Sequence, residues 1–63
     1  MNRIISILMK RDNLSLNEAT NLFEEVQTEV MEAISNGKGL LTVEDIIADE
    51  LGLEPDYFED LLF

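Results

Sequence analysis

Side chains that carry out nucleophilic chemistry are scarce in this chain. Its 63 residues include no His and no Cys, so a serine nucleophile would lack its usual neighbouring base. The three serines, Ser6, Ser15 and Ser35, fall in an apolar segment, at an expected helix start and at an expected helix end. Lys38 stands between two glycines, but its neighbours do not form a phosphate-binding loop. The sequence therefore predicts a protein that is not an enzyme.

Carboxylates are the only abundant reactive groups, with 14 Asp and Glu against 4 Lys and Arg and a formal net charge of -10. Acid–base catalysis by a carboxylate pair needs one member in an apolar pocket that raises its pKa, and so short a chain has little core for such a pocket. The alternating spacing of a calcium loop does not occur, and the His and Cys ligands that zinc prefers are missing. We expect no metal and no other cofactor.

The distribution of charge is uneven along the chain. Three of the four basic side chains lie within the first 11 residues, whereas all 14 acids lie from Asp12 onward with Lys38 as the only base among them. Each predicted helix after the first carries a row of acids, and these rows form a candidate interaction surface. Its members are Glu25, Glu29 and Glu32 in the second helix, Asp45 and Asp49 in the third, and Asp56, Glu59 and Asp60 in the fourth.

Two interpretations of this acidic surface remain open. In the first, the charge keeps the chain soluble, and the protein makes an ordinary contact with a protein partner. In the second, the chain is an inhibitor that imitates nucleic acid and occupies the basic groove of a DNA- or RNA-handling protein. We favour the first. Direct binding to DNA or RNA is not expected under either, because the acids would repel phosphate.

The elements that must position these side chains are four predicted helices in a single domain, residues 1–63. They cover about residues 2–11, 16–36, 43–51 and 55–62. Ser15 and Glu18 form a capping box at the start of the second helix, and Asn36-Gly37 supplies its left-handed stop. Strand-like alternation does not occur, so the sequence predicts an all-α, compact four-helix bundle. The apolar positions of the second helix are Leu16, Ala19, Leu22, Phe23, Val26, Val30, Ala33 and Ile34.

Turn residues define the last two helices. Thr42 is expected to cap the third helix, with Leu41 and Ile46 at the spacing of a hydrophobic staple. Gly52 ends that helix, and Pro55 suits the first turn of the fourth because its missing N–H is not needed there.

Apolar residues gather within the last six positions of the chain. In a monomer this cluster must pack against the apolar side of the first helix, and otherwise it would be exposed and would drive dimerisation. We expect at least weak self-association, which makes a homodimer one of the expected partners. The candidate residues for this contact are Phe58, Leu62 and Phe63.

Residues 43–58 contain a small residue, Ala48, followed four positions later by Gly52 and then by the apolar Leu53. Tyr57, Phe58 and Leu61 follow at packing positions. This pattern resembles the helix-turn-helix of arabinose-regulator-type transcription factors and implies a similar arrangement of the last two helices. In that family the second helix reads the DNA major groove with polar and basic residues. Here the matching helix carries acids and no Lys or Arg, so the resemblance does not extend to DNA reading.

The chain contains three short motifs: Leu8-Met9-Lys10-Arg11-Asp12, Leu16-Asn17-Glu18-Ala19 and Leu51-Gly52-Leu53-Glu54-Pro55-Asp56-Tyr57. Together they resemble those of short acidic proteins found in phages and mobile elements of Gram-positive bacteria. Asn13 stands where such proteins often have Gly, which is compatible with a turn. The resemblance implies a genomic setting and not an activity.

The remaining features concern location. The longest apolar stretch, residues 4–9, is far shorter than the roughly 20 residues that span a membrane, and Lys10 and Arg11 follow it at once. The absence of Cys suits a reducing compartment. We therefore expect a cytoplasmic protein-interaction module, without membrane contact, derived from a phage or mobile element.

Overall fold

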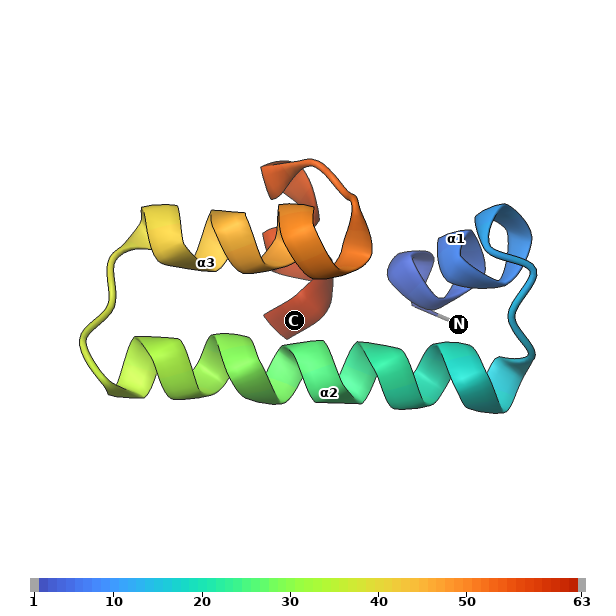
Figure 1. Cartoon of the computed structure of the whole chain (residues 1–63), viewed down its shortest axis with the longest axis horizontal. Coiled ribbons are helices and arrows are strands. Elements are labelled where there is room, and N and C mark those ends of the chain that lie inside the picture. The colour runs from blue at the N-terminus through green and yellow to red at the C-terminus, as the bar shows by residue number, and fades with distance from the viewer. Residues whose placement is uncertain (1, 63) are drawn as a thin grey trace.

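The computed structural model describes residues 2–62, and within that range the chain is all-α (Figure 1). The described residues form four α-helices and no strand: α1 (Arg3–Arg11), α2 (Leu16–Ser35), α3 (Leu40–Ile46) and α4 (Phe58–Leu62). A π-helical turn, η1 (Ile47–Leu51), continues α3, and a 3-10 turn, η2 (Pro55–Tyr57), leads into α4. The predicted all-α class is confirmed.

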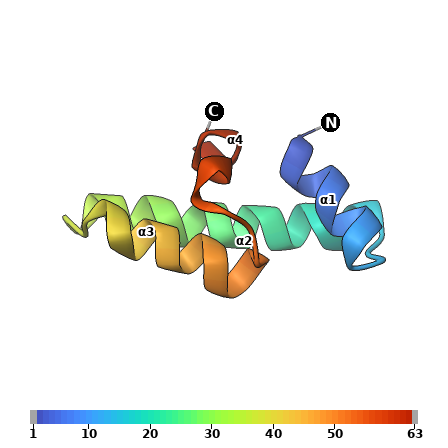
Figure 2. The ribbon, with the colours of Figure 1, turned by 90° about the horizontal axis from the view of Figure 1, so that it is seen from above.

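Helix α2 is the element on which the others pack. It runs the length of the molecule, with α1 and α3 along the same side at its two ends and α4 between them (Figure 1). Seen from above, α1 crosses over α2, α3 runs back along it, and α4 lies on the opposite side of α2 from α3 (Figure 2). The resulting bundle measures 33 × 18 × 18 Å.

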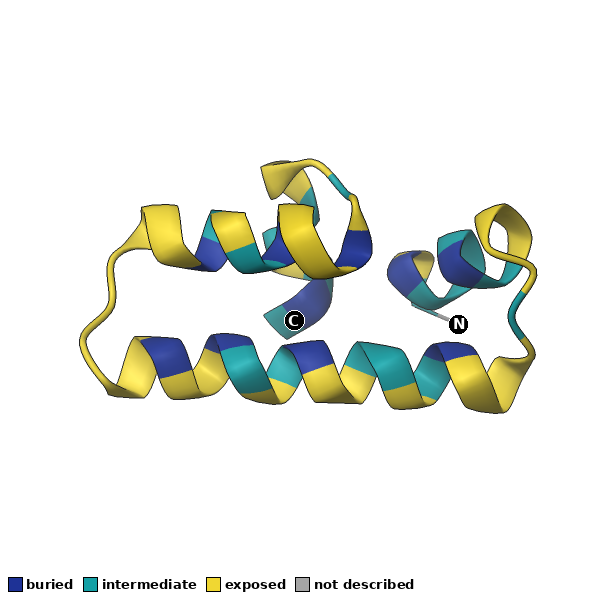
Figure 3. Cartoon of the chain, in the orientation of Figure 1, coloured by how far each residue is buried: buried dark blue, intermediate teal, exposed yellow. Residues whose placement is uncertain are grey.

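The core lies where these helices meet. Buried segments of α2 face the other three helices (Figure 3). None of the buried residues in the described part of the chain is polar or charged, so the carboxylates there lie at the surface, as the helical spacing predicts. Burying each large aliphatic side chain stabilises the fold by roughly 1.5–3 kcal/mol. The buried residues are Ile4, Leu8, Ala19, Val26, Val30, Ala33, Val43, Ile47, Leu51 and Leu61.

Both ends of α2 have the predicted caps. The Ser15 hydroxyl accepts a hydrogen bond from the Glu18 N–H at 3.1 Å, and the Glu18 carboxylate accepts one from the Ser15 N–H at 2.9 Å. At the other end Gly37 has a φ of 76°, and the Lys38 N–H donates to the Ala33 carbonyl at 2.9 Å. These bonds satisfy backbone groups that a helix end otherwise leaves unpaired, which explains why the predicted bounds of α2 are accurate.

The predicted start of the third helix is wrong. Helix α3 begins at Leu40, before the expected cap Thr42, and Gly39 precedes it in an extended conformation without a side-chain cap. Leu41 is 77% exposed and forms no staple with Ile46. The helix starts early because Gly39 already supplies the extended turn residue, so Thr42 lies inside the first helical turn.

Two positions predicted for the apolar face of α2 are also exposed. Leu16 is 50% exposed because it is the first residue of the helix, at the end of the molecule. Ile34 is 46% exposed in the last turn. Helix α2 is longer than the surfaces packed on it, so its two end turns contribute less to the core.

The helix-turn-helix resemblance holds for the turn and fails at the crossing. Gly52 adopts the left-handed conformation with a φ of 64°, as a turn glycine does. Ala48, expected where the two helices cross closely, is exposed. Because η1 is a π-helical turn, it shifts the angular position of the residues in it relative to an α-helix.

Candidate interaction surfaces

Three of the eight predicted acidic residues come together with a fourth acid that the sequence analysis missed. Glu25 and Glu29 lie one turn apart on α2, and η1 brings Glu50, the neighbour of Asp49 in the chain, close to them. A hydrogen bond with the Glu29 carboxyl raises the pKa of Glu50, and desolvation and the charges of Glu29, Glu25 and Asp49 raise it further. These four residues, the carboxylate cluster, form a site of concentrated negative charge.

The carboxylate cluster does not have the geometry of a metal centre. Among residues 2–62, no group of three or more carboxylate, His or Cys side chains is placed to hold a metal ion. The arrangement instead produces repulsion between surface carboxylates, of a few tenths of a kcal/mol per neighbouring pair.

Asp60 differs from the other predicted acids because its charge is paired. The Arg3 Nε donates to the Asp60 carboxylate at 2.5 Å, and the Arg3 guanidinium lies 4.8 Å from the centre of the Tyr57 ring. The Asn2 side-chain amide donates to the Asp60 backbone carbonyl at 2.6 Å. Asp60 therefore joins α4 to the start of α1 and contributes little negative charge to a partner.

The C-terminal end of α4 is held from α2 as well. The Gln27 side-chain amide donates to the Leu61 carbonyl at 2.7 Å, next to the carbonyl that Asn2 satisfies. These two bonds provide partners for carbonyls in the last turn of a five-residue helix, which would otherwise depend on water. These bonds fix the position of α4 and therefore determine which of its side chains are exposed.

Arg11 is a structural residue whose partners the sequence did not reveal. Its guanidinium donates to the Leu51 carbonyl at 2.6 Å and to the Gly52 carbonyl at 3.1 Å, at the C-terminal end of η1. It also forms two hydrogen bonds with Asp12, which raise the pKa of Arg11 and lower the pKa of Asp12. The sequence shows that a basic residue lies in the last turn of α1, but it does not show that this residue contacts a carbonyl 40 residues further along the chain.

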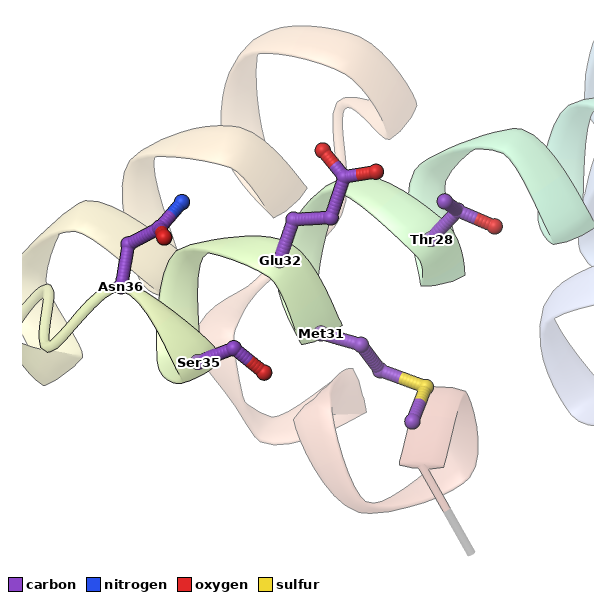
Figure 4. A pocket seen from close by; sticks show the side chains of 5 residues that line it. All are labelled: Thr28, Met31, Glu32, Ser35 and Asn36. Carbon is purple, nitrogen blue, oxygen red and sulfur yellow. The ribbon is translucent and has the colours of Figure 1, made fainter.

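The first apolar surface feature is a groove between α2 and α4. Met31 and Ile34 line it from α2, with Ser35 beside them, and Leu62 lines it from α4. Met31 is 55% exposed. Figure 4 shows Met31 extending from α2 towards α4, whereas the Glu32 side chain extends away from α4. We call the first four residues the α2–α4 groove.

The second feature is a groove between α3 and α4, the α3–α4 groove. Its apolar members include Leu40, which is 61% exposed, and Phe58, which packs partly against the core. The complete lining is Leu40, Glu44, Pro55, Asp56, Phe58 and Glu59. The predicted acids Asp56 and Glu59 thus border an apolar surface, whereas Asp45 is exposed on α3 and lines neither groove.

The predicted self-association residues have divided roles. Phe58 and Leu62 are half-buried and pack against the core that contains Ile4 and Leu8, so this cluster closes onto the first helix. The same two side chains also line the grooves. Phe63 lies outside the described residues.

Comparison with protein-family models, with curated proteins and with solved structures finds no significant match to this chain. Across residues 2–62, every helix is too short or too polar to cross a membrane. Function therefore has to be argued from the surfaces described above.

Proposed function

We propose that this chain is a small, non-enzymatic protein-interaction module. The observation that carries the proposal is the placement of exposed apolar side chains beside acids at one end of the bundle. Met31, Ile34 and Leu40 remain accessible to solvent although the core nearby is fully closed.

Exposed apolar groups next to polar groups are typical of binding surfaces. Each of these side chains loses part of the roughly 1.5–3 kcal/mol that full burial would contribute. Protein interfaces combine an apolar centre with a polar rim, and the α3–α4 groove likewise has both apolar and acidic residues in its lining. The resemblance of three short motifs to those of phage and mobile-element proteins favours an origin in such an element.

A capture experiment tests the proposal. The immobilised chain is incubated with host lysate in low and in high salt, and the retained proteins are compared with those retained by a double variant, Met31→Ser with Leu40→Ser. We expect a protein that the wild type retains and the variant does not. A matched double variant, Leu16→Ser with Leu41→Ser, changes two exposed apolar residues outside the grooves and should retain it. Retention of no protein at either salt concentration would contradict the proposal.

The second candidate function, imitation of nucleic acid, is favoured by the carboxylate cluster. Its crowded carboxylates, which raise the pKa of Glu50, concentrate negative charge on the surface. A positively charged phosphate-binding groove would attract that charge. The same capture experiment separates the two candidates. If imitation is correct, replacing Glu25, Glu29 and Glu32 with Gln abolishes capture and the retained protein is a nucleic-acid-handling protein released by salt. Capture that survives these three changes contradicts imitation.

A further inference from the structure

The two grooves lie on the same side of α4. Phe58 lines the α3–α4 groove and Leu62 lines the α2–α4 groove, and the two residues are four positions apart on one helix. Side chains at that spacing lie about 5–6 Å apart on one face. The grooves are therefore neighbouring parts of one surface, joined along this face of α4.

The charges around this surface have one sign. Glu44, Asp56 and Glu59 line the α3–α4 groove, whereas the lining of the α2–α4 groove is uncharged. None of the residues that line either groove is Lys or Arg. Asp60, the acid of α4 that has a basic partner, is absent from both linings. The unpaired acids are thus the ones that a ligand would meet.

The negative charge of this surface disfavours some binding partners and favours others. A second copy would bring the same acids and a net charge of -10 against the surface, and like charges placed opposite each other oppose association. Nucleic acid would be repelled for the same reason. An occupant needs apolar groups for the grooves and positive charges for their borders, and an amphipathic helix with Lys and Arg beside its apolar face has both.

We infer that the surface formed by the two grooves binds a basic amphipathic helix of a partner protein. The apolar side chains of that helix lie against Met31, Leu40 and Phe58. Its Lys and Arg side chains pair with Glu44, Asp56 and Glu59. The inference rests on the proposed function and adds the chemistry of the partner. A helix of about 14 residues is roughly 21 Å long, more than the 18 Å width of the bundle.

The test uses two synthetic peptides of about 14 residues, long enough to form about four helical turns. One has Leu on one helical face and Lys on the other, and the matched peptide has Glu in place of Lys. Calorimetric titration of the full chain should show binding of the Lys peptide that weakens as salt rises from about 50 to about 500 mM, and no binding of the Glu peptide.

Paired variants locate the binding. Met31→Ser with Leu40→Ser should weaken Lys-peptide binding by about tenfold or more, whereas Leu16→Ser with Leu41→Ser should change it by less than about twofold. Glu44→Gln with Glu59→Gln should weaken it more than Asp45→Asn with Glu54→Gln, which removes the same charge outside the grooves. Circular dichroism of each variant confirms that the helices remain.

Several results would overturn the inference. Equal effects of Glu44→Gln with Glu59→Gln and of Asp45→Asn with Glu54→Gln would show attraction to net charge alone. Equal effects of the two Ser double variants would place the binding outside the grooves, and equal binding of the Glu peptide would remove the need for a basic partner. Sedimentation of the wild type as a dimer that Met31→Ser with Leu40→Ser dissociates would identify a second copy as the occupant. If the lysate protein is still captured through the grooves in any of these cases, the inference fails while the proposed function stands.

Discussion

Among residues 2–62, three adopt left-handed backbone conformations, and each ends or follows a helix. Their φ values are 57° for Asn13, 76° for Gly37 and 64° for Gly52. A side chain raises the energy of this conformation by roughly 1–2 kcal/mol because Cβ approaches the following carbonyl oxygen, and Asn tolerates it better than most residues. The left-handed conformation of Asn13 lies in the segment that links α1 to α2.

Replacing Gly52 with Ala should destabilise the fold by about 1 kcal/mol, since the left-handed conformation becomes strained. An added Cβ would lie 3.5 Å from the nearest Arg11 atom, which is ordinary contact, so the backbone is the main cause. Urea denaturation of Gly52→Ala and of the control Gly39→Ala measures the effect. Gly39 has a φ of -76° and open space around it, so Ala should be tolerated there far better. Equal losses in the two variants would contradict the argument.

At the scale of the elements, η1 depends on a residue that belongs to another helix. Helix ends leave several carbonyls without intrahelical partners, and a positive charge near them is favourable. Arg11 supplies both the charge and two hydrogen bonds at the end of η1, to Leu51 and Gly52. It therefore connects α1 with the end of the segment that carries Asp49 and Glu50.

Replacing Arg11 with Met should lower the free energy of unfolding by about 1 kcal/mol, because hydrogen bonds from a charged group are lost while an aliphatic stem of similar length is kept. Solvent screening limits the effect, since the Arg11 side chain is 41% exposed. Thermal unfolding monitored by circular dichroism measures it. Lys10→Met, at the neighbouring exposed position, removes the same charge and should have a clearly smaller effect. A loss in Lys10→Met as large as in Arg11→Met would show that net charge and not the cap is responsible.

The sequence predicts an element well when the residues that determine its ends lie close to those ends in the chain. Helix α2 is bounded by Ser15, Glu18 and Gly37, all within a few residues of its ends, and its bounds were predicted closely. The start of α3 depends on a choice between Gly39 and Thr42, two residues that both favour caps, and local rules did not decide it.

At the scale of the whole molecule, apolar spacing predicts the core, but it does not predict which acids meet. The carboxylate cluster exists because η1 packs against α2 with Glu50 near Glu29. A π-helical turn contains an extra residue relative to an α-helical turn, and this rotates the residues that follow around the helix axis. An acidic row inferred from regular α-helical spacing therefore included Asp49 and missed Glu50.

The charges of the whole molecule should make stability depend on pH in two opposing ways. The raised pKa of Glu50 means that the folded state binds its proton more readily, so stability rises as pH falls from above that pKa to its ordinary value of 4.5. The hydrogen bonds with Ser15 lower the pKa of Glu18, and Arg11 lowers that of Asp12. Stability from these two groups is lost as pH falls below their ordinary values of 4.5 and 3.8 towards the lower folded-state values. Stability should therefore be greatest at mildly acidic pH.

Glu50→Gln isolates the first of these effects, because the amide removes the negative charge and keeps the shape. At neutral pH the variant should be more stable than the wild type by a few tenths of a kcal/mol, since its neighbours no longer repel a carboxylate. Its stability should also rise less as pH falls towards 4.5, because the group that gains a proton on folding is absent. Urea denaturation at several pH values measures both changes. Asp45→Asn removes one charge at an exposed site outside the cluster and accounts for the general relief of net charge. A variant that gains no more stability than this control would show that the carboxylates of α2 and η1 do not repel each other in the folded protein.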